Sequence, residues 1–259
     1  MTRARSTAAW SRRSVLATAA GAVLGACGVG SAKQAARAGR LPTTTTAPPT
    51  TTTTAVPAGP ATYVANGPRS GTGVALTFHG SGDISLTEQL LAEAKQQSAP
   101  ITVFGVGTWL QANPDIGHQI LAGGHTLGNH TFDHPDLGSL DADAVAAEIS
   151  RCATILDQLE GNNGRWFRPS GIVVPTSLIL EQAGLAGYRV SVGYDVDPLD
   201  YEDPGAPAIV DRVTQALRPG SIVSLHTGHA GTVQAFPGLV ELIRGRNLTP
   251  VLIGDLITA

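Results

Sequence analysis

From about residue 70 onward, short apolar runs alternate with longer amphipathic stretches, and this alternation constrains the fold more than any other feature. Strands that alternate with helices form a mainly parallel sheet or barrel. We expect strands at 74–78, 101–106, 125–129, 166–168, 190–194, 222–226 and 250–253. We expect helices near 87–97, 114–122, 141–160, 175–183, 206–217 and 232–244. Seven strands suit a shortened β/α barrel, because the eight-stranded form typically needs ~250 residues.

The N-terminal segment has the composition of an export signal. The first 40 residues carry seven of the 17 Lys and Arg and no acidic residue. Arg12 and Arg13 precede an uncharged run of 13 residues rich in Ala and Gly, a pattern that resembles a twin-arginine signal. A span across a bilayer needs ~20 residues, so this run is too short to cross comfortably. We therefore expect residues 1–26 to be a signal peptide.

The run ends in Leu24-Gly25-Ala26-Cys27, which resembles the lipobox of bacterial lipoproteins, in which the Cys thiol receives a diacylglyceryl group. Two acyl chains hold a protein on a membrane, because each buried methylene contributes ~0.8 kcal/mol. The alternatives are a cleaved signal without lipid and an uncleaved anchor. All three place the body outside the cytoplasmic membrane, and we expect it on the outer face of that membrane, anchored through Cys27.

The segment that follows the lipobox is expected to be a disordered tether over residues 27–69. Nine Thr and five Pro occur between residues 41 and 60, a composition with too little apolar surface to fold. The expected folded domain then covers residues 70–259. Cys152 lies on the apolar face of the expected helix 141–160, which indicates a core thiol and no disulfide.

Polar side chains follow the expected strands at their carboxyl ends, where parallel β/α folds gather their chemistry. His130 and His134 are the strongest metal candidates, because an i, i+4 pair on a helical turn directs two imidazoles the same way. A carboxylate is the natural third ligand. A catalytic zinc then keeps its fourth position for water.

Five motifs occur in sequence order: Thr77-Phe78-His79, Asn129-His130-Thr131-Phe132-Asp133-His134, Phe167-Arg168-Pro169-Ser170-Gly171, Asp195-Val196-Asp197-Pro198-Leu199-Asp200-Tyr201 and Leu225-His226. Their order and spacing resemble the polysaccharide deacetylases of carbohydrate esterase family 4, also called NodB-homology domains. The resemblance runs from about residue 73 to the C-terminus. It implies an α/β fold with a deformed (β/α)7-type barrel.

The resemblance also implies metal-dependent hydrolysis of the N-acetyl group of an N-acetylhexosamine polymer. His130 and His134 would be metal ligands. His226 would be the general acid that protonates the departing amine, and Asp200 would orient it. Arg168 would hold the catalytic base or a charged neighbour in place.

The same resemblance assigns three residues to substrate binding. Tyr201 and Leu225 would form walls of the acetyl pocket, and Pro169 would contact the substrate. Tyr201 stands where the family usually has Trp.

The first motif departs from the family pattern Thr-Phe-Asp-Asp-Gly, in which the first Asp is the general base and the second a metal ligand. Here Phe78 is followed by His79, and the next acidic residue is Asp83. The preferred interpretation makes Asp83 the third ligand, brought back by the flexible Gly80 and Gly82, with His79 as the base. The alternative makes His79 the third ligand and Asp83 the base.

Three functions are therefore considered. The first is a zinc-dependent deacetylase of an N-acetylglucosamine-containing glycan such as peptidoglycan or a chitin-like polymer. The second is a glycan-binding lipoprotein of the same fold with impaired catalysis, and the third is a metal-dependent amidase that acts on a small non-glycan amide. His226 with Asp200 favours an enzyme, because binding alone needs no carboxylate-supported proton donor.

The charge of the body excludes one class of partner. Outside the first 40 residues, ten basic residues face all 20 acidic ones, which leaves a net charge of −10. Nucleic-acid binding needs clustered Lys and Arg to neutralise phosphates, so no nucleic-acid partner is expected. We expect a monomer.

Overall fold

The computed structural model describes residues 59–257, in which seven strands and eight α-helices alternate along the chain. The expected signal peptide, the lipidation site Cys27 and the tether up to residue 58 lie outside the described residues. No helix among residues 59–257 is long and apolar enough to cross a membrane.

All of the strands pair in parallel, which confirms the expected fold class. The strands are β1 (Thr62–Val64), β2 (Gly73–Gly80), β3 (Thr102–Gly105), β4 (Thr126–Asn129), β5 (Val190–Val192), β6 (Ile222–His226) and β7 (Thr249–Val251). Five of them form a sheet in the order β4-β3-β2-β6, with β7 paired to the start of β2, and β1 pairs with β5.

The segment 166–168 was expected to be a strand but contributes only single-residue bridges. Phe167 bridges Asn129 of β4 on one side and Ser191 of β5 on the other. The ladder ends at once, because Pro169 has no backbone N–H to donate. Phe167 nevertheless connects the two groups of strands, which gives the expected deformed and incomplete barrel.

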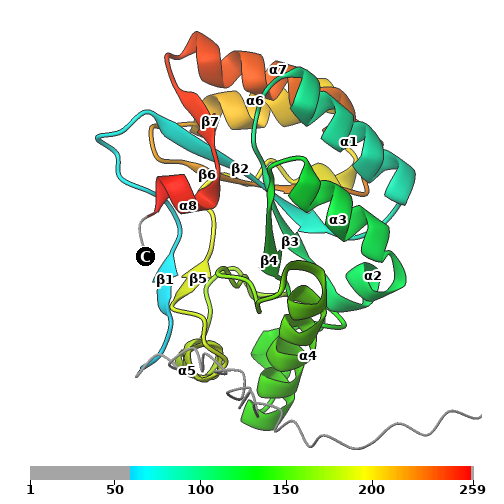
Figure 1. The fold of residues 1–259 in the computed structure, drawn as a ribbon. Helices are drawn as coiled ribbons and strands as arrows, with labels where there is room; N and C mark the ends of the chain where they lie inside the picture. The colour runs from blue at the N-terminus through cyan, green and yellow to red at the C-terminus, as the bar shows by residue number, and fades with distance from the viewer. Residues whose placement is uncertain (1–58, 258–259) are drawn as a thin grey trace, which may run out of the picture. The chain divides into compact units, whose positions relative to one another are not determined.

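Helices cover the outside of the strands (Figure 1). They are α1 (Ile84–Gln96), α2 (Gly107–Ala112), α3 (Pro114–Ala122), α4 (Ala142–Glu160), α5 (Ser177–Leu185), α6 (Ala206–Ala216), α7 (Ala230–Gly245) and α8 (Ile253–Leu256), with short 3₁₀ helices η1 (Leu137–Ser139) and η2 (Asp200–Glu202). Figure 1 shows α1, α6 and α7 together on one side of the sheet, whereas α5 lies beside β1 and β5.

Local signals explain where α4 and α5 begin and where α4 ends. Asp141 caps α4 by accepting a hydrogen bond from the backbone N–H of Ala144, and Thr176 caps α5 through the N–H of Ile179. Gly161 ends α4 in the left-handed conformation, with a φ of 75°, which glycine adopts without strain.

The expected tether extends too far toward the C-terminus. Thr62–Val64 form β1 in register with Val190–Val192, and Ala61 is buried and donates its N–H to the carbonyl of Leu180. The folded domain therefore begins near residue 60, not at residue 70. Three residues after a Pro-rich segment are too short a run for periodicity to identify as a strand.

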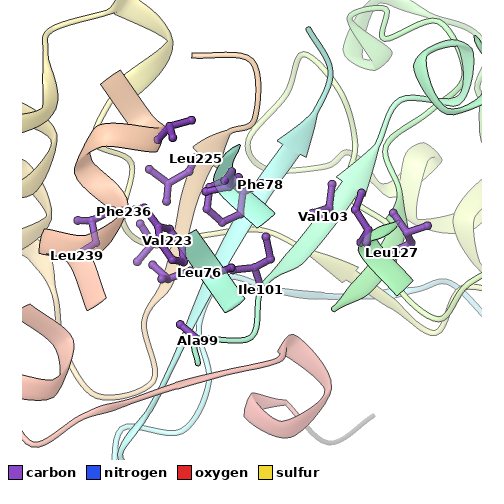
Figure 2. Close-up of a cluster of buried hydrophobic side chains, with 14 of the residues drawn as sticks. Leu76, Phe78, Ala99, Ile101, Val103, Leu127, Val223, Leu225, Phe236 and Leu239 are labelled. Atoms are coloured by element: carbon purple, nitrogen blue, oxygen red, sulfur yellow. The ribbon is translucent and has the colours of Figure 1, made fainter. Parts of the chain in front are cut away.

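Side chains of β2 and β6 alternate between two environments. Figure 2 shows Phe78 and Leu225 among the apolar residues beside Phe236 and Leu239 of α7, so this face packs against the helices. A separate apolar cluster lies on the inner face and combines residues of the strands with residues of α8. Its members include Ala75, Phe104, Trp166, Val190, Val192, Ile222, Ile253 and Leu256. The polar site lies on the inner face beyond this cluster.

Candidate active site

Side chains along β2 and β6 point alternately to the two faces of the sheet, which places the polar residues of both strands on the inner face. The register pairs Thr77 with Ser224 and His79 with His226, while the intervening Phe78 and Leu225 belong to the outer core. The rings of His79 and His226 lie 4.5 Å apart between centroids. Two adjacent strands therefore present two imidazoles at the same end of the barrel.

Three histidines converge at this point. Each of His79, His130 and His134 offers a ring nitrogen, and these nitrogens all lie within 4.8 Å of one another. The ring of His130 lies 4.4 Å from that of His79 and 4.9 Å from that of His134, between centroids. Such a group of nitrogens can hold a divalent metal ion.

The segment that carries His130 and His134 is a loop and not the helical turn expected from their spacing. Thr131 and His134 have positive φ angles of 65° and 59°, which no α-helix accommodates. Glu148 of α4 holds the loop, because its Oε2 accepts the backbone N–H groups of Phe132 and Asp133 at 2.9 and 2.8 Å. The two imidazoles meet through this tertiary anchor.

The environment keeps the cluster neutral. Burial lowers the pKa of His79 and of His130 well below the usual range, and the neighbouring histidines and Arg168 lower it further. Burial also lowers the pKa of His134. Neutral imidazoles expose a nitrogen lone pair at neutral pH, which is the form that binds metal.

A second group faces the cluster from β6 and η2. His226 Nδ1 lies 2.7 Å from Oδ1 of Asp200, and Asp200 is fully buried. The other carboxylate oxygen, Oδ2, accepts the backbone N–H of His226 at 2.8 Å and the hydroxyl of Thr232 at 2.6 Å. The pair is therefore fixed on both sides, and Nε2 of His226 is left for a substrate.

The histidines open into a pocket with a volume of about 290 Å³. Its wall includes Pro169 and Tyr201, as the resemblance implies. It also includes Tyr194, for which no motif predicts a role. Tyr201 is half exposed at the rim, and its ring lies 5.3 Å from that of His226. The remaining wall is formed by residues of the loop after Pro169: Gly171, Ile172 and Val173.

Arg168 lies under the histidines and makes other contacts than those expected. It is buried, and its guanidinium donates to Oγ1 of Thr77 and to the carbonyls of Val192 and Gly193. Among residues 59–257 it forms no ion pair with a carboxylate, so it does not hold a charged base. Desolvation lowers the pKa of Arg168, yet a guanidinium remains charged at neutral pH.

Asp83 does not join the site. It is exposed and caps α1, with Oδ1 accepting the backbone N–H of Ser85 at 2.7 Å. Hydrogen bonding from the side chain and from the backbone N–H of Ser85 lowers the pKa of Asp83. The short Gly80–Gly82 connection leads directly into a helix, and a helix N-terminus attracts the carboxylate. The structure therefore does not support Asp83 as a metal ligand or as the base. It places His79 beside His130 and His134 instead.

Leu225 also lies elsewhere than expected. It is fully buried on the outer face of β6, next to α7, and not in the wall of the pocket (Figure 2). The reason is the strand period, since a residue that precedes an inward-facing histidine must face outward.

Three residues that organise the site were missed, and two of them carry a signal in the sequence. Glu148 is a lone acid on the apolar face of α4, beside Ile149 and Cys152, and Ser224 interrupts an apolar strand two residues before His226. Thr232 carries no comparable signal. Cys152 itself is buried, and desolvation raises its pKa to about 12, which keeps it an unreactive core thiol.

Comparisons with known proteins agree with this geometry. Residues 66–191 match the polysaccharide deacetylase family. A chitooligosaccharide deacetylase of Sinorhizobium fredii is 35% identical over 178 residues, which cover 64% of this chain and 78% of that protein. A peptidoglycan-N-acetylglucosamine deacetylase of Bacillus cereus is 31% identical over 176 residues, which cover 66% of this chain and 62% of that protein.

Solved structures give the same result. The crystal structure of a peptidoglycan N-acetylglucosamine deacetylase superposes with a TM-score of 0.70 at 27% identity, over 76% of this chain and 93% of that one. A family 4 pseudoenzyme from Bacillus anthracis shares the fold, with a TM-score of 0.71 at 20% identity, over 75% of this chain and 68% of that one. The chain therefore belongs to the polysaccharide deacetylase family and is a hydrolase that acts on carbon–nitrogen bonds.

Proposed function

We propose that this protein is a metal-dependent deacetylase that removes N-acetyl groups from an N-acetylglucosamine-containing glycan of the cell envelope. The observation that carries the proposal is that His79 and His134 of the three-histidine cluster line the same pocket as His226, whose ring is held by the buried Asp200. A cation site and a proton donor then flank a single substrate position. The two relatives named as chitooligosaccharide and peptidoglycan deacetylases support the substrate class.

The three histidines would hold the cation. Their fit is indicated by Nε2 of His130, which is buried and has no hydrogen-bond partner among residues 59–257. A buried nitrogen lone pair without a partner is unfavourable unless a cation takes it. Imidazole ligands suit zinc, and we propose Zn²⁺ as the metal. The bound cation would polarise the acetyl carbonyl and activate water.

His226 would supply the proton to the departing amine. With Nδ1 donating to Asp200, the proton that moves is carried on Nε2, which faces the pocket. The buried carboxylate stabilises the charged imidazolium and holds the ring in one orientation, so the proton is delivered without rotation of the side chain.

The pocket would select a small acyl group. The pocket has a volume of about 290 Å³ and is lined by polar histidines and by an apolar wall that includes Pro169, Ile172 and Tyr194. This wall suits the methyl of an acetyl group, while the open rim at Tyr201 leaves room for the sugar ring.

A direct experiment measures acetate release from N-acetylglucosamine oligomers by the full chain, with and without a chelator, beside His130→Ala. We expect the chelator and the substitution each to lower the rate by at least ~100-fold, because a metal supplies several kcal/mol of transition-state stabilisation. His118→Ala is the matched control, because His118 is exposed on α3 and far from the cluster in the fold. Equal rates in all samples would refute the metal-dependent reaction.

A glycan-binding protein with impaired catalysis is the second candidate. The observation that favours it is that, within the described part of the chain, no carboxylate joins the three histidines. Tight binding of the oligomers without acetate release, from protein loaded with Zn²⁺, would establish this function. Acetate release from a small aromatic acetamide but from no oligomer would instead indicate an amidase.

We also propose that the protein is exported, is anchored to the outer face of the cytoplasmic membrane through a lipid on Cys27, and acts as a monomer. Incorporation of a labelled fatty acid in cells should occur in the wild type and be lost in Cys27→Ala. Cys152→Ala is the control, because Cys152 is buried and free. Light scattering of the purified protein tests the monomer.

A further inference from the structure

The ring of His79 has one polar neighbour that none of the proposed roles explains. Oγ of Ser224 lies 3.1 Å from Nε2 of His79, and Ser224 is almost completely buried on the inner face of β6. The backbone N–H of Ser224 is already bonded to the carbonyl of Val196. Within residues 59–257, Oγ of Ser224 makes no hydrogen bond except the one with His79.

His130 shows the same arrangement with the ring reversed. Its Nδ1 lies 2.9 Å from the carbonyl oxygen of Arg168, which can only accept, so Nδ1 carries the proton and Nε2 keeps its lone pair. A metal-binding histidine characteristically has its second nitrogen held in this way by an acceptor outside the metal site. Within residues 59–257 the hydrogen bond of the His79 ring is made at Nε2, so Nδ1 is the nitrogen left to bind a cation.

We propose that Ser224 is a positioning residue that accepts the Nε2 proton of His79 and so directs Nδ1 to the cation, which makes His79 the third ligand. The inference rests on the proposed metal-dependent function. It explains how an imidazole serves where the family resemblance leads one to expect a carboxylate. His79 would then bind the cation through Nδ1 and His130 through Nε2. His134 completes the set of three neutral imidazoles.

Affinity for Zn²⁺ tests the role of the hydroxyl. In the full chain, Ser224→Ala should weaken Zn²⁺ binding about 10- to 100-fold, measured by competition with a chromogenic chelator, since loss of such an outer partner has that effect. Ser191→Ala is the matched control, because Ser191 is a buried serine in the middle of β5 and lies outside the cluster. It should change the affinity less than about twofold. Ser224→Thr keeps the hydroxyl and should restore most of the affinity.

The tautomer gives a second readout that does not depend on a variant. In the Zn²⁺-loaded wild type, long-range ¹H–¹⁵N spectra should show the proton of His79 on Nε2 and that of His130 on Nδ1. A proton on Nδ1 of His79, or an unchanged affinity in Ser224→Ala, would overturn the inference. If the wild type binds Zn²⁺ and releases acetate while Ser224→Ala binds equally well, only the role of Ser224 fails. If the wild type binds no Zn²⁺, the proposed function fails with it.

Discussion

Asp200 holds His226 twice, through the imidazole Nδ1 at 2.7 Å and through the backbone N–H at 2.8 Å. A single carboxylate therefore fixes both the ring and the main chain of the proposed proton donor. Thr232 donates to the same carboxylate, and Asp200 is completely buried. Because a displaced carboxylate would lose three hydrogen bonds at a buried position, the pair is rigid.

Asp200→Asn should reduce kcat for acetate release by about 10²- to 10⁴-fold, the range attributed to a positioned general acid. The neutral amide gives no charge to balance the doubly protonated ring that has to deliver a proton from Nε2, so the acid is less available. Bound metal should not change, because Asp200 does not belong to the three-histidine cluster.

Asp203→Asn is its matched control. Asp203 pairs with Nδ1 of His229 at 2.8 Å in the same geometry, but its side chain is 69% exposed. This substitution should leave kcat within about twofold. Equal losses in the two variants would contradict the assignment of His226 as the acid.

Asp83→Ala should leave the metal content unchanged, because Asp83 caps α1 and does not approach the cluster. His79→Ala should lower it. Hydrogen bonding from the side chain and the backbone of Ser85 lowers the pKa of Asp83, so the stability that this residue contributes is present at neutral pH and is lost as the pH falls through that lowered pKa. The thermal midpoint of the variant should accordingly be lower at neutral pH and closer to the wild type in acid. A loss of metal in Asp83→Ala would restore the interpretation that it is a ligand.

Arg168→Lys should lower the free energy of unfolding by about 2–4 kcal/mol, because an ammonium cannot reproduce the fork that reaches Thr77, Val192 and Gly193. Denaturant titration measures the change. The control is Arg165→Lys on the same segment, where the side chain is exposed and the expected change is under ~0.5 kcal/mol. A change in Arg168→Lys as small as in the control would show that these bonds contribute little.

Glu160→Gln should stabilise the protein at alkaline pH relative to the wild type. Burial raises the pKa of Glu160 to about 7, and its Oε1 has no hydrogen-bond partner within residues 59–257. The folded state therefore holds a proton that the unfolded state releases, and stability falls as the pH rises through 7. Because the side chain is only partly buried, we expect a difference of only about 1 kcal/mol between pH ~5 and ~8.

Unfolding curves at several pH values test this prediction. Glu181→Gln on the exposed surface of α5 provides the comparison. If Glu160→Gln and the wild type show parallel dependence on pH, the raised pKa of Glu160 is wrong.

Most of the fold could be predicted because its strands and helices carry strong periodic signals. The helix 114–122 and the strand 222–226 have the expected bounds in the structure. What could not be predicted depends on tertiary contacts. β1 exists only because β5 pairs with it, and Phe167 joins two groups of strands through single bridges that no local pattern encodes.

The site could be predicted in part for a related reason. Spacing identified His130 and His134 but attributed their convergence to a helical turn, whereas a loop with two left-handed residues brings them together. The expected return of Asp83 relied on glycine flexibility, and the capping preference of α1 outweighs it. Strand alternation, applied to Leu225 and Ser224, would have placed the first on the outer face of β6 and the second on its inner face.

Glu148 receives both amides of the loop between His130 and His134, and it belongs to a helix of 19 residues whose apolar face is part of the core. Metal capture is therefore thermodynamically linked to the docking of α4. A substitution that weakens the packing of α4, even one far from the pocket, gives the loop more conformational freedom. The loop then loses more entropy when the two imidazoles are brought together. Such a protein would release its metal at temperatures below its unfolding transition, and its inactivation would be reversed by excess metal.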